Sequence, residues 1–397
     1  GATGDTGRGR ARSLLVIAEV ALAFSLTIGA GLLVRAFIRV NRVPLGLQAD
    51  GALTLALSLP RTAYTTAADR ATFVERLRRE LAGIPGVTAA AVISRLPLNP
   101  GASTRSIEVE GAVARRGESL EPDYLVTSPG YFRSLGIRLL AGRDFTERDR
   151  PGTAPVVIVS RKLAETLWPG VPVLGRRLKV GDDTAWRTVI GLAADVQQHG
   201  LDRAPEPALY LPWADDPWPF LTVALRTRGD PAALATPAEA VIHGIDPDLA
   251  VSSIRPMAAV VADSLVARRF SLLLIGLFAG LALVLAIVGV YGVMAHSVAR
   301  RVRELGIRIA LGARPADVLR LIAGYGLRLA LSGIGLGLLL ALGLAPLLQS
   351  LLFGVRPLDP VTFAVVTLSV LGVVLVAGLV PARRATRVDP MRTLREE

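Results

Sequence analysis

The sequence predicts an α-helical membrane protein of four spans, arranged as one plus three, with a large mixed α/β domain outside the membrane. Three uncharged apolar runs crowd into the last third of the chain, at Phe270–Ala295, Leu329–Val355 and Val361–Ala382. A fourth run, Leu14–Val34, lies near the start and is interrupted only by Glu19. Because a helix needs roughly 20 apolar residues to cross a bilayer, each run is long enough to span it.

Arginine residues flank these runs in a pattern that orients the chain. They precede the first run, separate the second from the third and follow the fourth: Arg8, Arg10, Arg12, Arg300, Arg301, Arg303, Arg308, Arg314, Arg320, Arg383, Arg384, Arg387, Arg392 and Arg395. Basic residues close to a span mark its cytoplasmic side, so we expect both termini in the cytoplasm. The net charge of +12 is then largely a topology signal with a contact to anionic lipid, and not a sign of nucleic-acid binding.

These observations divide the chain into four parts. We expect a cytoplasmic segment at 1–13, a first span at 14–40, an outside domain at 44–267 and a membrane region at 268–397. Within the last region we expect spans at 270–295, 319–345 and 361–382, a cytoplasmic helix at 300–313 and a basic tail. A signal peptide is the alternative for the first run, but arginines follow it where small residues would mark a cleavage site.

The outside domain alternates short strands with helices. The clearest unit is a strand at 52–59, a helix at 68–81 with Phe73, Leu77 and Leu81 on one face, and a strand at 87–93. Further strands are expected at 105–110, 156–159, 187–192 and 221–226, and further helices at 162–167 and 231–245. Pro237 would kink the last helix or delay its start.

No catalytic, cofactor-binding or metal-binding motif is recognisable. The chain has no G-x-x-x-x-G-K-[ST] loop, no H-E-x-x-H and no cysteine. The three histidines lie far apart in the sequence: His199, His243 and His296. Paired acids at 182–183 and 215–216 adjoin turn-forming residues and are expected in solvated turns. We therefore expect no enzymatic activity and no cofactor, although a pocket that gathered His199 or His243 with acids would favour an enzyme.

Small and charged residues in the spans are candidates for helix packing and function. Gly276 and Gly280 form one GxxxG pair and Gly333 and Gly337 another, and such pairs let helices approach closely in lipid. Either pair could pack within the chain or against a second copy. Glu19 is the one acid within a span, so it is either functional or close enough to the cytoplasmic interface to reach it.

The loop between the second and third spans carries the most distinctive motif. Val302, Leu305 and Ile309 fall on one helical face, Gly312 can end that helix and Pro315 can start the next. The pattern predicts a short amphipathic helix at the inner membrane surface. It is either an interfacial helix held by lipid headgroups or a docking element for a cytoplasmic partner.

Several motifs resemble the FtsX-like, MacB-type family of ABC transporter permeases. Arg303–Arg308 (RELGIR) with Ala310–Ala313 (ALGA) resembles its cytoplasmic motif, and Pro381–Arg395 resembles the end of its last span. The outside domain resembles the MacB-type periplasmic core at Pro85–Val87, Ser128–Phe132, Gly142–Phe145, Leu174–Arg177 and Asp246–Leu249.

The resemblance implies a permease subunit in the bacterial inner membrane that couples ATP hydrolysis by a partner ATPase to motion of its outer domain. It implies efflux or extrusion of lipoprotein-type substrates, a dimer with a second permease copy or half, and in some systems a periplasmic adaptor. The residues that would contact the ATPase are Arg303, Glu304, Leu305, Gly306, Ile307, Arg308, Ala310, Leu311 and Gly312.

Two questions stay open on the sequence alone. The alternative function is a non-transporting transducer whose outer domain activates a cell-wall hydrolase. The chain begins at Gly1 without an initiator methionine, which would fit a fragment or the second half of a duplicated permease. Neither the substrate nor the identity of the ATPase follows from the residues.

Overall fold

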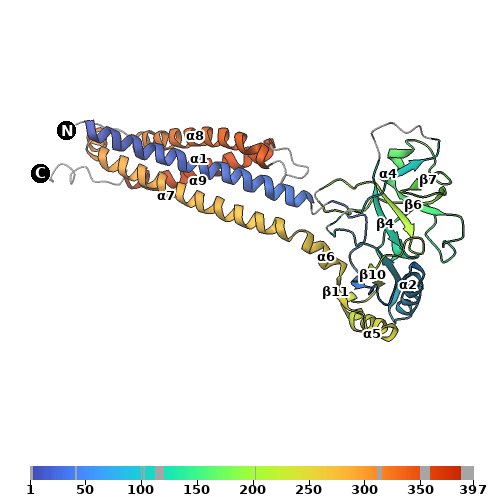
Figure 1. The fold of residues 1–397 in the computed structure, drawn as a ribbon. Helices are drawn as coiled ribbons and strands as arrows, with labels where there is room; N and C mark the ends of the chain where they lie inside the picture. The colour runs from blue at the N-terminus through green and yellow to red at the C-terminus, as the bar shows by residue number, and fades with distance from the viewer. Residues whose placement is uncertain are drawn as a thin grey trace. The chain divides into compact units, whose positions relative to one another are not determined.

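The computed structural model describes residues 3–40, 43–99, 101, 103–111, 120–201, 203–310, 315–348 and 358–385. The chain divides into two compact units (Figure 1). Gly1–Arg42 and Ala267–Glu397 form a helical unit, and Val43–Val266 form an α/β unit. The expected fold class, four membrane helices and a mixed α/β domain, is confirmed.

The helical unit contains four described helices that are long and apolar enough to cross a membrane: α1 (Thr3–Val40), α7 (Val266–Ala310), α8 (Pro315–Leu348) and α9 (Pro360–Ala385). Its core includes Phe24 and Ile28 of α1, Ala286 and Val290 of α7, Val370 of α9, and Ala330, Ile334 and Ala341 of α8. Many large apolar side chains remain exposed on the outside of the helices, as lipid-facing residues require.

Helix α7 differs from the expectation of a span followed by a separate cytoplasmic helix. It runs from Val266 to Ala310 without a break, so the segment expected at 300–313 continues the second span as far as the structure describes it. Between His296 and Ala310 the sequence has no proline and contains four arginines, which favour helix, and Gly306 costs only about 1 kcal/mol. Helix α1 likewise begins at Thr3, upstream of the apolar run.

The α/β unit is built on one mixed sheet. Its strands are β1 (Ala52–Ser58), β2 (Val87–Ile93), β3 (Ile107–Val109), β4 (Asp123–Thr127), β5 (Leu139–Gly142), β6 (Val156–Ser160), β7 (Arg177–Val180), β8 (Arg187–Ala193), β9 (Ala208–Pro212), β10 (Phe220–Thr227) and β11 (Val251–Pro256). Its helices are α2 (Ala67–Ala82), α3 (Tyr131–Ser134), α4 (Arg161–Leu167), the 3₁₀ turn η1 (Pro231–Leu234), α5 (Ala235–Ile245) and α6 (Met257–Ser264).

The strand order has a weak junction in its middle. The sheet runs β11-β1-β10-β2-β4-β9-β6-β8-β7-β3, with β5 added to β8. β1 and β10 pair along their whole length, whereas β2 and β4 meet only at Ile93 and Thr127. The sheet therefore consists of two well-paired halves joined by one residue pair.

Helix α2 shows how local sequence positions the first half. The Thr66 side chain accepts a hydrogen bond from the Asp69 N–H and the Asp69 carboxylate accepts one from the Thr66 N–H, which closes a capping box. The helix ends before Gly83, and its Phe73, Leu77 and Leu81 are buried in the core of the α/β unit. The sequence prediction for this strand–helix–strand unit is confirmed.

Candidate functional site

The segment expected to contact an ATPase lies at the end of α7. Residues 303–310 form its last turns, and Leu311 and Gly312 lie outside the described residues. Only the backbone of this segment is described, so its amphipathic character remains a sequence prediction.

The glycines of α8 face α1 at very short range. A Cβ atom added to Gly333 would lie 2.7 Å from Cβ of Val20, and one added to Gly337 would lie 2.7 Å from the carbonyl oxygen of Ala21. Side chains at these positions would push the two helices apart. In the helical unit this GxxxG pair packs within the chain.

The glycines of α7 behave differently. A Cβ added to Gly276 or Gly280 would meet no described heavy atom within 4 Å. Both residues are exposed, beside Leu273, Leu277 and other large apolar side chains. This second GxxxG pair is an open face among the described residues.

Glu19 points at α7 rather than toward the end of the bundle. A Cβ on Gly289 would lie 1.9 Å from Oε2 of Glu19, so the missing side chain provides the room for the carboxyl group. Oε2 is buried and meets no hydrogen-bond partner among the described residues. The residue therefore packs between α1 and α7.

At the start of α9, Asp359 connects two helices. Its Oδ2 accepts hydrogen bonds from the N–H of Thr362 at 2.9 Å and from the Thr362 hydroxyl at 2.6 Å, which caps the helix. The same carboxylate forms an ion pair with Arg35 of α1. Asp359 thus connects the start of α9 to α1.

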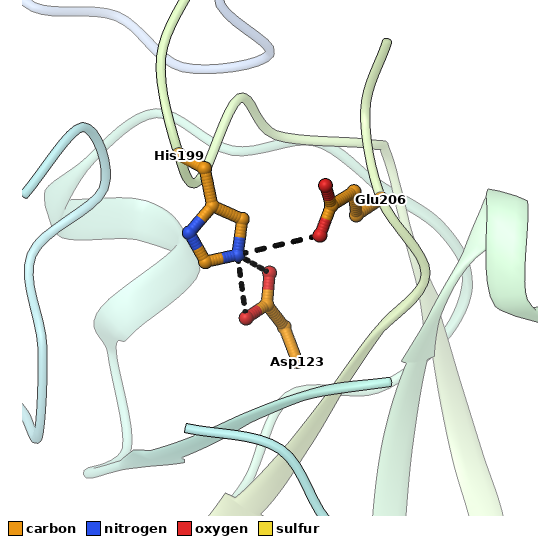
Figure 2. A group of neighbouring side chains, drawn as sticks. All are labelled: Asp123, His199 and Glu206. Carbon is orange, nitrogen blue, oxygen red and sulfur yellow. Dashed lines mark hydrogen bonds and ion pairs between the residues drawn. The ribbon is translucent and has the colours of Figure 1, made fainter. Parts of the chain in front are cut away.

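In the α/β unit, the structure gathers a histidine with two acids, as Figure 2 shows. Nε2 of His199 lies 2.8 Å from Oδ1 and 2.7 Å from Oδ2 of Asp123, and 3.5 Å from Oε2 of Glu206. The potential ligand atoms lie within 4.8 Å of one another, a spacing that a metal ion could bridge.

Arg95 contacts both Asp123 and His199 in this cluster. Its Nη2 lies 2.9 Å from Oδ1 of Asp123, and its Nη1 lies 3.5 Å from Nδ1 of His199. A guanidinium group only donates, so the contact with Arg95 favours the tautomer in which Nδ1 accepts and Nε2 carries the proton that faces Asp123. In that tautomer Arg95 and His199 both donate to the Asp123 carboxylate, while Oδ2 of Asp123 and Nε of Arg95 are buried without a hydrogen bond among the described residues.

The expectation of solvated turns holds for Asp182, which is exposed in a turn, but not for Asp183, Asp215 and Asp216, which are partly buried and hydrogen-bonded. Arg187 donates to Asp183 and to Asp215, each at 2.6 Å, and Asp216 accepts from the Tyr124 hydroxyl at 2.7 Å. Burial raises the pKa of Asp215, although the Arg187 guanidinium lowers it. These acids join strands of the second half of the sheet and form no acid–base pair.

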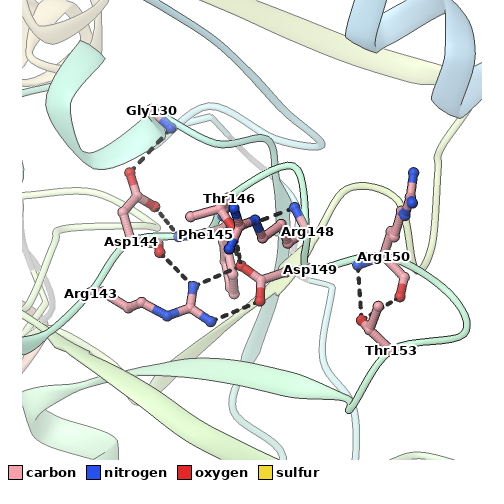
Figure 3. A network of polar contacts seen from close by, with 9 residues as sticks. All are labelled: Gly130, Arg143, Asp144, Phe145, Thr146, Arg148, Asp149, Arg150 and Thr153. Carbon is pink, nitrogen blue, oxygen red and sulfur yellow. Dashed lines mark hydrogen bonds and ion pairs between the residues drawn. The ribbon is translucent and has the colours of Figure 1, made fainter.

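Two motifs that are far apart in the sequence meet in the loop after β5 (Figure 3). The carboxylate of Asp144 accepts from the N–H of Gly130 at 3.1 Å and from the N–H of Phe145 at 2.7 Å. Burial raises the pKa of Asp144 above its usual range, although both N–H groups lower it. Asp144 thereby ties the turn before α3 to the loop after β5.

The comparison with known families assigns the architecture. Residues 13–241 match the model of the MacB-like periplasmic core domain, and residues 276–390 match the C-terminal domain of the FtsX-like permeases. A four-span membrane protein with a mixed α/β domain inserted after its first span is the class that this fold defines. The chain belongs to the MacB-type, FtsX-like family of ABC transporter permeases and is a multi-pass protein of the inner membrane.

Its relatives are export proteins. The chain is 28% identical over 319 residues to the macrolide export ATP-binding/permease protein MacB 2 of Aeromonas hydrophila subsp. hydrophila, covering 76% of this chain and 47% of that protein. It is 27% identical over 308 residues to the pyoverdine export ATP-binding/permease protein PvdT of Pseudomonas putida, covering 72% and 45%. The chain thus spans about half the length of these relatives.

A solved structure is similar to part of the chain. The periplasmic region of MacB from Actinobacillus actinomycetemcomitans aligns with a TM-score of 0.36 and 13% identity, covering 54% of this chain and 94% of that one.

Sequence reasoning missed the contacts that the sheet creates. Asp123 lies in β4, His199 follows β8 and Glu206 precedes β9, so only strand pairing brings them together. No spacing in the sequence signals this cluster. Gly130 and Asp144 each belong to a motif that resembles the family, Ser128–Phe132 and Gly142–Phe145, so the sequence singled out both residues. It did not indicate that the two motifs contact each other.

Proposed function

We propose that this chain is the transmembrane subunit of an ABC exporter and that a cytoplasmic ATPase drives it through the end of α7. In this mechanism, closure of the ATPase displaces the Val302–Leu311 segment. The displacement passes along α7 to the point where the chain enters the α/β unit, which moves as a rigid body.

One observation carries the proposal: α7 is a single helix of 45 residues. At 1.5 Å per residue, such a helix extends for about 68 Å, which exceeds the hydrocarbon thickness of a bilayer of roughly 30 Å. An unbroken hydrogen-bonded helix transmits axial and rotational displacement, whereas a flexible loop between span and motif would absorb it. Glu19 against Gly289 and the capped Asp359 keep the neighbouring helices in register with α7 and with α1.

The distribution of arginines indicates which parts of the protein face the cytoplasm. The arginine-rich end of α7 and both termini lie in the cytoplasm under the positive-inside rule, which leaves the α/β unit on the periplasmic side. The sequence has no phosphate-binding loop of the G-x-x-x-x-G-K-[ST] type, so we assign ATP binding and hydrolysis to the partner. The relatives carry both an ATP-binding and a permease function in their names, which supports such a partner.

The partners of the membrane unit follow from its two GxxxG pairs. Gly333 and Gly337 are occupied by α1, whereas Gly276 and Gly280 are open. We assign the open face of α7 to a second permease copy or half, which would pack on it as a dimer. Macrolides and pyoverdines differ chemically, so the relatives indicate export and leave the cargo open.

The test is a double substitution on the apolar face of the docking segment. Leu305→Asp with Gly306→Asp places two charges where an apolar contact with the ATPase is proposed. We expect co-purification of the ATPase and ATP-dependent export to fall at least tenfold, which corresponds to about 1.4 kcal/mol.

The control is Ala299→Asp, which adds one negative charge to an exposed position of the same helix. Six residues separate it from Leu305, which places it about 120° around the helix from that apolar side chain. Unchanged ATPase binding and export in the double variant would remove the docking role, as would an equal loss in the control.

A further inference from the structure

The pairing of β4 with β9 brings Asp123, His199 and Glu206 together. The two strands run parallel from their first residues, and the N–H of Asp123 donates to the carbonyl oxygen of Pro207 at 2.8 Å. Glu206 is thereby held next to the first residue of β4. His199 lies earlier in the same connection between β8 and β9. The sheet itself therefore fixes the position of all three side chains.

Three potential ligand atoms face one another in this cluster: Nε2 of His199, Oδ2 of Asp123 and Oε2 of Glu206 (Figure 2). Nε2 lies 2.7 Å from Oδ2 and 3.5 Å from Oε2. In a tetrahedral zinc site, bonds of about 2.0–2.2 Å place neighbouring ligand atoms about 3.4 Å apart. Nε2 and Oε2 already have this spacing, and an ion would only have to separate Nε2 from Oδ2 by about 0.7 Å.

The carboxylate of Asp123 has one oxygen that its neighbours leave available. The side chain is 1% exposed, and its Oδ1 accepts from Nη2 of Arg95 at 2.9 Å. Oδ2 is also buried, but it accepts no hydrogen bond from the residues that the structure describes. A buried carboxylate oxygen is costly unless a donor or a cation binds it. The side of the carboxylate that faces His199 and Glu206 therefore has room for a further ligand.

The charges in the cluster also favour a cation. Asp123 and Glu206 bring two negative charges, and Arg95 pairs with Asp123 alone. Glu206 forms no ion pair with a described arginine or lysine. Side-chain exposure falls from 47% at Glu206 to 13% at His199 and 1% at Asp123, so an ion can enter from the Glu206 side.

Metal binding requires the other tautomer of His199, because a metal at Nε2 takes the lone pair of that atom and leaves the proton on Nδ1. The contact that is lost joins Nδ1 to Nη1 of Arg95, and at 3.5 Å it is long for a hydrogen bond. Nη1 keeps its hydrogen bond to the carbonyl oxygen of Gly101, and Nη2 keeps Oδ1 of Asp123 in place. Ligating carboxylates in metal sites are commonly oriented by such an outer hydrogen bond.

We propose that Asp123, His199 and Glu206 bind a divalent transition-metal ion, for which zinc is the best-suited candidate. One imidazole nitrogen and two carboxylate oxygens match the ligands that zinc takes, and a water molecule completes four-coordination. The ion fastens His199 and Glu206 to the start of β4 and so stabilises the second half of the sheet. This site belongs to the α/β unit and does not depend on the proposed export function.

The experiment uses the full chain in lipid nanodiscs, with any affinity tag removed and the protein treated with a chelator. Zinc chloride is titrated in and followed by calorimetry, with empty nanodiscs as the blank. We expect one saturable site per chain with a Kd in the micromolar range or tighter. His199→Gln and Glu206→Gln should each weaken zinc binding at least tenfold, because each removes one ligand.

Two matched controls keep the ligand set intact. His243→Gln removes the other histidine of the α/β unit, whose Nε2 lies 3.2 Å from the carbonyl oxygen of Leu249. Glu121→Gln removes an exposed acid two residues before Asp123. Both variants should bind zinc as the wild type does. Glu206→Gln is the decisive variant, since Glu206 is half exposed and its loss does not threaten the fold.

Thermal unfolding supplies a second readout, followed by the fluorescence of tryptophans that all lie in the α/β unit. Zinc should raise the unfolding temperature of the wild type and of both controls, but not that of Glu206→Gln, because only a bound ion stabilises the folded state. The proposal is overturned if the wild type shows no saturable binding, if Glu206→Gln binds zinc as tightly as the wild type, or if His243→Gln loses binding to the same extent.

Discussion

Asp149 shows how one buried carboxylate orders the loop after β5. It accepts from Nη1 and Nη2 of Arg143 at 2.7 and 2.8 Å and from the N–H and hydroxyl of Thr146 at 2.8 and 3.0 Å (Figure 3). Burial raises its pKa, but these hydrogen bonds outweigh burial and hold the pKa below its usual range. A depressed carboxylate pKa stabilises the fold at pH values above the unfolded pKa of about 3.9.

Replacing this carboxylate should make the α/β unit less stable and less sensitive to acid. Asp149→Asn is expected to lower the free energy of unfolding at neutral pH by about 2 kcal/mol, because charged hydrogen bonds are lost. The difference from wild type should shrink as the pH falls below about 4 through the folded pKa. Urea unfolding followed by tryptophan fluorescence reports on this unit, since all four tryptophans lie between Trp168 and Trp218.

Asp182→Asn is the control, since Asp182 is exposed in the same unit. A wild-type pH profile in the Asp149 variant would show that the hydrogen bonds contribute nothing to stability.

The sequence could predict side-chain contacts only between residues that are close together in the chain. The GxxxG spacing indicated packing at four glycines, but the spacing is the same for both pairs. Which pair meets α1 depends on how the helices rotate in the bundle, and that is a tertiary property. For the same reason no sequence pattern indicated that Arg95 would contact both His199 and Asp123.

At the scale of elements, the contact between α8 and α1 depends on the absence of side chains. A Cβ on Gly337 would lie 2.7 Å from a backbone oxygen and 3.0 Å from Cβ of Phe24, neither of which can move cheaply. Gly335, two residues before it, is exposed, and a Cβ there would meet nothing within 4 Å. The two glycines form a matched pair on one helix.

Gly337→Ala should destabilise the helical unit by about 1–3 kcal/mol relative to Gly335→Ala, because it overpacks the interface. The second substitution should be neutral or stabilising through helix propensity. Unfolding in mixed micelles, titrated with sodium dodecyl sulfate and followed by circular dichroism, measures both. Equal midpoints for the two variants would contradict the close packing of α8 on α1.

Elements with a strong local period were predictable, and those defined by pairing were not. The strand at 87–93 and the helix near 68–81 follow from alternation and from helical spacing. β9, bounded by prolines, and β11, which contains two serines, have weak patterns and exist because a neighbouring strand pairs with them. The continuity of α7 was missed because the arginines from Arg300 onward indicated that the span ends near Ala295, whereas the helix continues to Ala310.

At the scale of the whole molecule, the open GxxxG pair of α7 provides a test of whether the protein forms a dimer. Gly276 and Gly280 lie one turn apart on an exposed face, and Gly292 is also exposed but about 160° around the helix from Gly276. The three positions allow the proposed dimer face to be tested without altering the core of the bundle.

Gly276→Ile with Gly280→Ile should weaken the proposed dimer at least tenfold, since bulky side chains prevent close approach of two helices. The mass of the particle in nanodiscs or detergent, measured by light scattering at several protein concentrations, reports the change. Gly292→Ile should leave it unaltered. A dimer that survives the double substitution would place the second copy on another surface.

Because α7 is unbroken, the number of residues between two of its positions sets the angle between their side chains around the helix axis. Each residue of an α-helix adds 1.5 Å of length and turns the chain by about 100°. One residue inserted between Gly292 and Arg303 would therefore rotate the RELGIR segment by more than a quarter turn relative to the contact of Gly289 with Glu19. Substitutions in this stretch leave that phase intact, whereas insertions and deletions would redirect the proposed docking face. Under the proposed coupling, the number of residues there is therefore itself a functional parameter.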